Sequence, residues 1–345
     1  MQGTTGDTAD NDGGQVARVR RTLASGRRWR MAEIAFWIAA IAAFWLLPRH
    51  LQLLKDVAIL ALFALSLDLI LGYAGIVSLG HGALFGFGAY VAGIFAKQVA
   101  ADPLLGLAVA ALASAVLGAA TSPLVLRGSD LSRLMVTLGV SLVLHEVANA
   151  LPAWTGGADG LQGIAMAPLF GRFTFDLYGR TAYVYATGVL FLLFLIARRI
   201  TTSPFGLSLV AIRDNRLRAT AIGIPVNRRL IAVYTLSGLY AGAAGALLAQ
   251  TTEFVSLDVL EFARSADVML ILIIGGTGYL YGGLIGAIAF KLMQDYLAAI
   301  TPQYWQFWVG LLLVVFVLGG RAWLEQAARW GRRRLARGSI VEPAP

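Results

Sequence analysis

The chain contains 345 residues, of which 58% are hydrophobic and only 14% are charged, and its mean hydropathy is +0.72. This composition excludes an ordinary soluble globular protein. The absence of cysteine excludes disulfides and thiol catalysis. Apolar windows of bilayer-spanning length recur from residue 31 to residue 317, so the sequence predicts an all-α integral membrane protein.

The net charge of +9 comes largely from arginines that cluster in the two tails. Arginines next to apolar spans are retained on the cytoplasmic side and favour anionic lipid. We therefore expect membrane lipid as a partner and no nucleic acid. Three regions follow: a disordered basic cytoplasmic tail at 1–30, a transmembrane domain at 31–320 and a second basic cytoplasmic tail at 321–345.

About ten membrane-spanning helices are predicted in chain order. Their boundaries are 31–47, 51–71, 83–100, 103–126, 133–151, 181–199, 230–251, 266–281, 283–300 and 304–320. The inner loops 127–133 and 198–229 carry more arginines than the outer loops 152–180 and 252–265. This asymmetry places both termini in the cytoplasm and predicts a multi-pass protein of the cell inner (cytoplasmic) membrane.

The stretch 69–89 is almost uncharged but rich in glycine. Glycine costs a helix about 1 kcal/mol relative to alanine, so this stretch is expected to break the membrane helix. Non-helical backbone at membrane depth occurs where protein or a water-filled cavity satisfies it, and such breaks commonly line transport sites. The predicted pathway residues here are Tyr73, Gly75, Ser78, Gly80, His81, Gly82 and Tyr90.

A second glycine cluster, 274–286, lies between two apolar runs and predicts a second break. Gly275, Gly276 and Gly278 are therefore assigned to the same pathway. Asp68 lies close to the first break, where it either holds the broken backbone or occupies a plain interface position.

Other features of the spans have structural interpretations. Lys55 and Asp56 are expected either to snorkel to the interface or to pair locally. Lys291 and Asp295 are i,i+4 neighbours, and they are expected to form a structural ion pair or a pair that faces the bundle interior. Small residues four positions apart predict close helix contacts within the chain, with dimerisation as the alternative; they are Gly82 and Gly86, Gly238, Gly242 and Ala246, and Gly282 and Gly286.

Neither a catalytic nor a metal site is predicted. Ser78 and His81 have the residue types of a nucleophile and its base, but no GxSxG elbow surrounds the serine. His145 and Asn149 share a helix face, yet the chain has only three histidines and no HExxH spacing. A membrane hydrolase is therefore the less favoured interpretation.

The outer loop around residues 154–163 has the composition of tight turns rather than of a strand or helix. It is either an ordinary turn or a structured loop at the outer mouth of the pathway. The residues assigned to it are Thr155, Gly156, Gly157, Asp159 and Gly160.

The inner segment 203–225 is predicted to form two short helices, 207–213 and 217–222, with Gly223 as a C-cap and Pro225 as a stop. This amphipathic elbow is expected to dock a cytoplasmic partner, and a membrane-surface helix is the alternative. Its tip presents Arg213, Asp214, Asn215 and Arg216.

Four segments, in this order, resemble the branched-chain amino acid ABC transporter permease family of the LivM type. They are LGYAGIVSLGHGALFGFGAYVAG at 71–93, Thr137-Leu138 and Asn149 followed by TGGADGLQGI at 155–164, RATAIGI at 218–224, and GGTGYLYGGLIGA at 275–287. The likeness covers residues 50–320 and leaves out the tails.

The resemblance implies a permease subunit, not an enzyme, of an ATP-driven importer for branched-chain or other hydrophobic amino acids. It implies three kinds of partner: a LivH-type second permease, two ABC ATPase subunits and an extracytoplasmic solute-binding protein. The sequence contains no GxxxxGK[ST] loop, so ATP is expected to be used by the partner subunits and no cofactor is expected on this chain.

The resemblance also implies a coupling loop at about residues 200–229 that contacts the ATPase. The implied contact residues are Arg213, Asp214, Asn215, Arg216, Ala219, Ala221 and Gly223. Arg218 stands where the generic importer signature has a glutamate, so no glutamate-specific contact is carried over.

Two other transporter functions stay open at this point. One is a permease of the same family for urea or short amides. The other is an ion-coupled secondary transporter that uses Asp68, Glu146 or Asp267 as relays.

Overall fold

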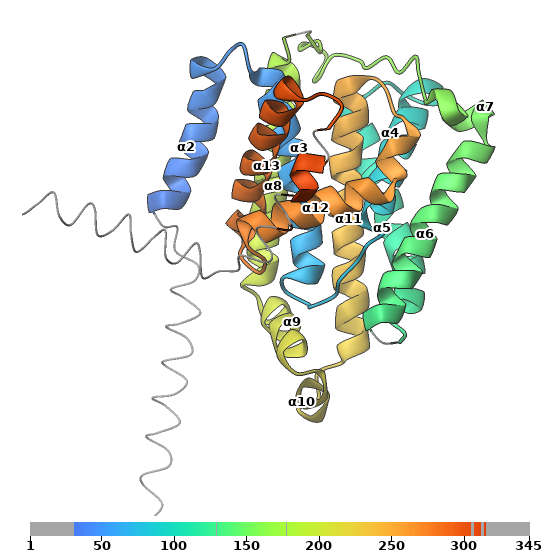
Figure 1. Ribbon diagram of the computed structural model, residues 1–345, viewed down its shortest axis with the longest axis vertical. Coiled ribbons are helices and arrows are strands. Elements are labelled where there is room, and N and C mark those ends of the chain that lie inside the picture. Colours follow the sequence, from blue (N-terminus) through green and yellow to red (C-terminus); the bar gives the residue numbers. More distant parts are fainter. Residues whose placement is uncertain (1–30, 129, 177, 305–306, 312–313, 315–345) are drawn as a thin grey trace, which may run out of the picture. The chain divides into compact units, whose positions relative to one another are not determined.

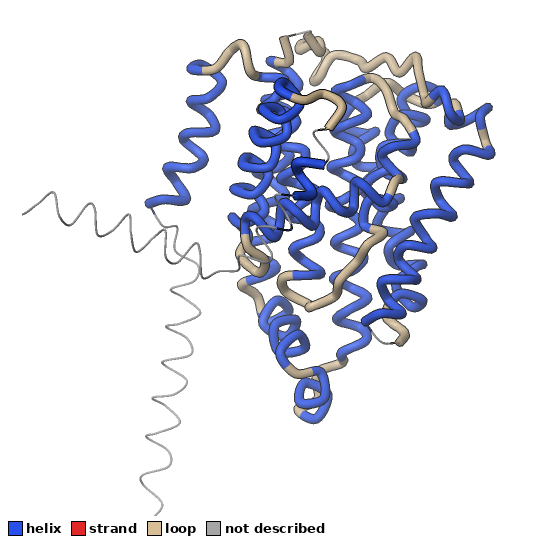
Figure 2. The backbone as a smooth tube through the Cα atoms, in the orientation of Figure 1, coloured by secondary structure: helices blue, strands red, loops and turns tan. Residues whose placement is uncertain are grey.

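The computed structural model describes residues 31–128, 130–176, 178–304, 307–311 and 314. In these residues the chain is helical, and its only β pairing consists of two isolated bridges (Figures 1 and 2). Five of the helices are long and apolar enough to cross a membrane. These findings confirm the all-α class and fit a membrane protein.

A helix covers most of each predicted span from 31–47 to 283–300. The helices are α2 (Met31–Leu46), α3 (Leu51–Leu71), α4 (His81–Gln98), α5 (Pro103–Val125), α6 (Asp130–Ala150), α8 (Arg180–Thr201), α11 (Val226–Thr252), α12 (Phe262–Gly275) and α13 (Leu280–Ile300). The five that meet the length and hydropathy criteria are α5, α6, α8, α11 and α13. The predicted span 304–320 falls mostly outside the described residues, as do both tails.

The predicted boundary at 266–281 is wrong. Helix α12 ends at Gly275, and the chain then turns through two glycines with positive φ, Gly276 (91°) and Gly278 (76°). The apolar character of the surrounding sequence hides this turn, because glycine can leave the helical region without a change in hydropathy.

Helix α11 packs against α3, α4 and α5 (Figure 1). The predicted small-residue contacts are confirmed in this helix. A Cβ atom on Gly238 would lie 2.7 Å from the carbonyl oxygen of Ser114 in α5, and one on Gly88 of α4 would lie 2.4 Å from Cα of Gly242. The absence of side chains therefore brings the helix backbones into direct contact.

Helix α2 is attached to the bundle by polar and aromatic contacts. The carboxylate of Glu33 lies 2.8 Å from the guanidinium of Arg198 in α8, and both side chains are largely buried. The indole N–H of Trp37 donates to the hydroxyl of Tyr281 at the start of α13 (3.3 Å). These two contacts fix α2 beside α8 and α13.

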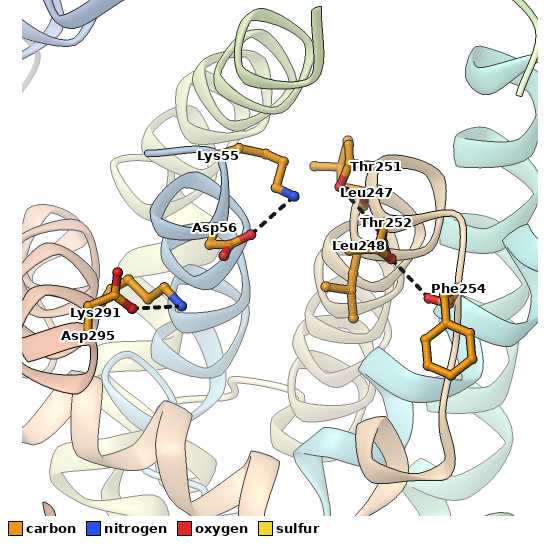
Figure 3. Close-up of polar contacts among 9 residues, drawn as sticks. All are labelled: Lys55, Asp56, Leu247, Leu248, Thr251, Thr252, Phe254, Lys291 and Asp295. Atoms are coloured by element: carbon orange, nitrogen blue, oxygen red, sulfur yellow. Dashed lines mark hydrogen bonds and ion pairs between the residues drawn. The ribbon is translucent and has the colours of Figure 1, made fainter. Parts of the chain in front are cut away.

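Both predicted ion pairs within the membrane helices are confirmed (Figure 3). Lys55 lies 3.3 Å from Asp56 in α3, and the lysine side chain is buried. Lys291 lies 3.4 Å from Asp295 in the last half of α13. From Phe290 onward, the described residues belong to a second compact part of the chain.

Candidate translocation pathway and inner coupling site

The first predicted helix break is confirmed, since residues 72–80 between α3 and α4 are not helical. Gly75 has φ of +70°, a conformation that L side chains rarely adopt. The backbone N–H of Leu79 donates to Oγ1 of Thr137 in α6 (3.2 Å). A Cβ on Gly80 would lie only 1.8 Å from the carbonyl oxygen of Thr137. Helix α6 therefore supplies a hydrogen-bond acceptor for the backbone of Leu79 and packs closely against Gly80.

His81, the first residue of α4, is fully buried in a polar cluster. Its Nε2 lies 2.8 Å from Oγ of Ser66 and 3.5 Å from Oγ of Ser237, and its ring stacks on Phe63 with centroids 5.6 Å apart. The partners of Nε2 come from α3 and α11, and Ser78 is not among them. The cluster joins α3, α4 and α11, which supports a structural role.

We expect His81→Ala to lower the free energy of unfolding by about 2–4 kcal/mol, because it leaves a cavity beside Phe63 and removes one of the two hydrogen-bond partners of the buried Ser66 and Ser237 hydroxyls. Ser78→Ala removes one hydroxyl and is the matched control. Thermal unfolding of the purified chain measures both effects. If Ser78→Ala abolished uptake in a folded, assembled complex, the structural interpretation would be contradicted.

Four residues from three segments meet near the inner end of α3, and we call them the inner cluster: Asp68, Gly72, Arg213 and Gly278. Oδ1 of Asp68 accepts a hydrogen bond from the backbone N–H of Gly278 (2.7 Å). The guanidinium of Arg213 donates to the carbonyl oxygen of Gly72. Asp68 thus holds a broken backbone, as predicted, but that backbone belongs to the second break.

Glycine is required inside this cluster. A Cβ on Gly72 would lie 2.1 Å from Oδ1 of Asp68 and 2.4 Å from the backbone nitrogen of Gly278. At the second break, a Cβ on Gly275 would lie 1.8 Å from the carbonyl oxygen of Gly282. The two glycine-rich breaks are therefore in direct contact, and both are closely packed.

The inner elbow consists of α9 (Pro204–Asp214) and α10 (Arg216–Ala221), so the two predicted short helices are confirmed with slightly different ends. Asn215 caps α10 by accepting from the backbone N–H of Arg218 (2.9 Å), and Gly223 has φ of +86°. Pro225 immediately precedes α11 and marks the point where the chain changes direction between α10 and α11. Figure 1 shows α9 and α10 at one end of the bundle.

The predicted coupling residues divide into two groups. Arg213 points back to Gly72, and Ala219 is buried. By contrast, Arg216 is exposed and donates to Oδ1 of the exposed Asn227 (3.0 Å). Arg213, Asp214, Asn215, Ala221 and Gly223 are exposed as well, and the guanidinium of Arg213 also lies 3.3 Å from the carboxylate of Asp214. The exposed surface of the elbow therefore includes Arg213, although this side chain also donates to the carbonyl oxygen of Gly72.

The outer loop is built from short helical turns, α7 (Pro152–Thr155) and η1 (Gly157–Asp159). Oγ1 of Thr155 donates to the carbonyl oxygen of Ala148 (2.5 Å), and Gly156, Gly157 and Gly160 all have positive φ. The next residue, Leu161, forms an isolated bridge with Val255. Asp159 is exposed. The glycines thus turn this loop onto the segment that follows α11.

That segment is the feature that sequence reasoning missed. Residues 252–265 were predicted to form an outer loop, but residues 255–265 run back along α4. A Cβ on Gly86 would lie 2.6 Å from Leu260, and one on Gly82 would lie 3.2 Å from the carbonyl oxygen of Glu261. The signal was present in the four-residue spacing of Gly82 and Gly86, which opens a groove along α4.

The end of α11 shows how the chain enters this path. The hydroxyl of Thr252 donates to the carbonyl oxygens of Leu248 (2.7 Å) and Phe254 (2.9 Å), as Figure 3 shows. Glu253 has φ of +54°, so the helix ends there with a left-handed residue. The chain therefore reverses its direction within two residues, and the segment that follows runs back beside α4.

The remaining polar candidates occupy different environments. Tyr90 is buried, and its hydroxyl has no hydrogen-bond partner among the described residues. Glu146 and Asn149 are exposed on α6, whereas Asp267 is partly buried in α12. No group of three His, Asp or Glu side chains in the described part of the chain could hold a metal ion.

A helical membrane protein with two contacting helix breaks and a polar inner elbow has the construction of a transport protein. The sequence matches the family described as branched-chain amino acid transport system / permease component over residues 49–317. The chain belongs to this permease family, as the sequence resemblance predicted. No solved structure matches the chain.

Relatives within this group carry different names. The chain is 27% identical over 287 residues to the high-affinity branched-chain amino acid transport system permease protein LivM of Salmonella typhimurium, covering 74% of this chain and 65% of that protein. It is 30% identical to the autoinducer 2 import system permease protein LsrC of Klebsiella pneumoniae, covering 88% of each. It is 26% identical to the fructose import permease protein FrcC of Rhizobium meliloti, covering 86% and 84%. Family membership therefore leaves the substrate open.

Proposed function

We propose that this chain is a membrane-spanning permease subunit of an ATP-driven importer for branched-chain or other hydrophobic amino acids. The match of residues 49–317 to the branched-chain permease family carries the proposal, and the LivM relatives support its substrate class. The LsrC and FrcC relatives favour a second candidate, the import of a small sugar-like solute.

The proposal includes three kinds of partner in the inner membrane and on its two faces. Two ABC ATPase subunits would bind the exposed surface of α9 and α10. A LivH-type permease would complete the membrane part, in keeping with the similarity to a LivH protein of Methanocaldococcus jannaschii (29% identical). A solute-binding protein would deliver substrate near Thr155–Gly160. ATP would be used by the partner subunits.

The inner cluster suggests how ATPase movement would reach the pathway. A displacement of the elbow pulls on the carbonyl oxygen of Gly72 through Arg213, and Asp68 connects the same helix end to Gly278. Closely packed elements of this kind respond to force by switching between discrete arrangements rather than by stretching. The elbow would therefore move both glycine breaks together.

Reconstitution tests the proposal. The chain is incorporated into liposomes with its second permease, its ATPases and its binding protein, and uptake of radiolabelled leucine and of fructose is compared with and without ATP. We expect leucine uptake that requires ATP and the ATPase subunits and that survives a protonophore. Uptake by the chain alone that a protonophore abolishes would instead identify an ion-coupled transporter, and ATP-dependent uptake of fructose alone would select the second candidate.

A further inference from the structure

Charged residues recur at every third position where the chain descends beside α4. They are Asp258, Glu261, Arg264 and Asp267, and we call them the charged stripe. Asp258 lies in the 3₁₀-helix η2 (Leu257–Leu260), and Glu261 directly precedes α12. Residues three apart lie on one face of an α-helix, so Arg264 and Asp267 share a face of α12, and Asp258 and Glu261 precede them in the segment that leads into this helix.

The contacts of this segment place the stripe at membrane depth. Val255 lies beside Gly93 near the end of α4, and Ser265 lies beside Gly82 near its start. The hydroxyl of Ser141, in the middle of α6, donates to the carbonyl oxygen of Leu260 (2.9 Å). The segment thus follows most of the length of α4.

The side chains of the charged stripe lie on the side of the segment that faces away from the bundle. Val259 and Leu260 are buried against the bundle, whereas Asp258 and Glu261 are exposed and Arg264 is half-exposed. A charged side chain at the centre of a bilayer costs about 2.5–3.5 kcal/mol, so these side chains must face water or protein and not lipid.

A further polar group faces the same place. The hydroxyl of Tyr90 has no hydrogen-bond partner among the described residues, its side chain is only 4% exposed, and it interacts electrostatically with Asp258. A buried hydroxyl without a partner costs free energy unless water or a ligand completes it. The hydroxyl of Tyr90 is thus available as a hydrogen-bond donor near Asp258, the first residue of the charged stripe.

We infer that the charged stripe and Tyr90 form the polar lining along which the solute passes, with the acidic pair Asp258 and Glu261 meeting its ammonium group and Arg264 meeting its carboxylate. The charges of both signs match a zwitterion, so the inference rests on the proposed amino-acid transport. It moves substrate recognition from the glycine stretch, where Ser78 and His81 are fully buried, to the neighbouring segment.

Thiol labelling tests this lining without depending on uptake. The chain has no cysteine, so Asp258→Cys and Glu261→Cys each give one thiol in this subunit. Val116→Cys, at an exposed apolar position in the middle of α5, and Leu260→Cys, at a buried one, are matched controls. The assembled, nucleotide-free complex is treated with a cationic or an anionic methanethiosulfonate, and modification of this subunit is read by mass.

We expect modification at 258 and 261 at least tenfold faster than at 116 or 260, faster for the cationic reagent, and slowed by leucine. In uptake assays, Asp258→Asn and Glu261→Gln should raise KM at least tenfold while ATPase co-purification is unchanged. Labelling of the isolated chain but not of the assembled complex would show that a second permease covers the stripe and would overturn the inference. ATP-driven uptake of leucine without labelling would overturn it too, while leaving the proposed function intact.

Discussion

Gly245→Ala is expected to destabilise the helix bundle and lower its Tm. A Cβ at this position in α11 would lie 1.9 Å from the backbone carbonyl oxygen of Phe85 and 2.8 Å from the backbone nitrogen of Ala89, both in α4. Backbone atoms cannot rotate away as a side chain can, so α4 and α11 must separate. Overpacking of this kind costs about 1–3 kcal/mol or more, which exceeds the gain of about 1 kcal/mol from replacing glycine by alanine in a helix.

Gly188→Ala is the matched control, because Gly188 is also inside a membrane helix, α8, and no atom lies within 4 Å of its added Cβ. We expect this variant to be neutral or more stable. The measurements are the yield of monodisperse protein after detergent extraction and the Tm of the purified chain. Equal Tm values for the two variants would contradict the close approach of α4 and α11.

Arg213→Ala is expected to reduce ATP-driven uptake about ten- to a hundredfold without loss of the ATPase subunits. The variant removes the hydrogen bond from the elbow to the carbonyl oxygen of Gly72, and hydrogen bonds to charged groups contribute about 1.5–3 kcal/mol. ATP hydrolysis should continue while transport falls, because the elbow no longer moves the inner cluster. Arg213→Lys, which retains a positively charged donor group, should restore part of the uptake.

Arg216→Glu is the comparison that separates coupling from docking. Arg216 is exposed, and its side chain donates to Asn227 at the start of α11 rather than to the inner cluster. We expect this variant to lose ATPase co-purification while it still inserts and folds. If Arg213→Ala also lost the ATPases, Arg213 would belong to the docking surface. If uptake by Arg213→Ala were unchanged, the inner cluster would have no coupling role.

The positions of the helices were predictable because their causes are local in sequence. Runs of apolar residues mark α5, α8 and α11, and glycine-rich stretches mark the two breaks, since glycine lowers helix stability wherever it occurs. The elbow was also predictable: Asn215 caps α10, and Gly223 supplies the left-handed residue after it. Each of these features depends on residues within one or two helical turns.

Several features depended on contacts between distant segments and could not be predicted in this way. Asp68 meets Gly278 across 210 positions, and Arg213 meets Gly72 across 141. The pairing of His81 with Ser66 and Ser237 is equally non-local. A hydropathy pattern shows that a polar residue lies in a span, but the side chain that approaches it is set by how the helices pack.

The sequence by itself determined the membrane class, the order of the helices and the family, because composition, apolar length and ordered motifs are properties of the chain alone. Only the tertiary structure decided where the charged stripe lies. Residues 252–265 have the polar composition of an outer loop, yet the bare surface of α4 at Gly82 and Gly86 admits their backbone. Burial of Val259 and Leu260 then holds this segment at membrane depth, where its charges face away from the bundle.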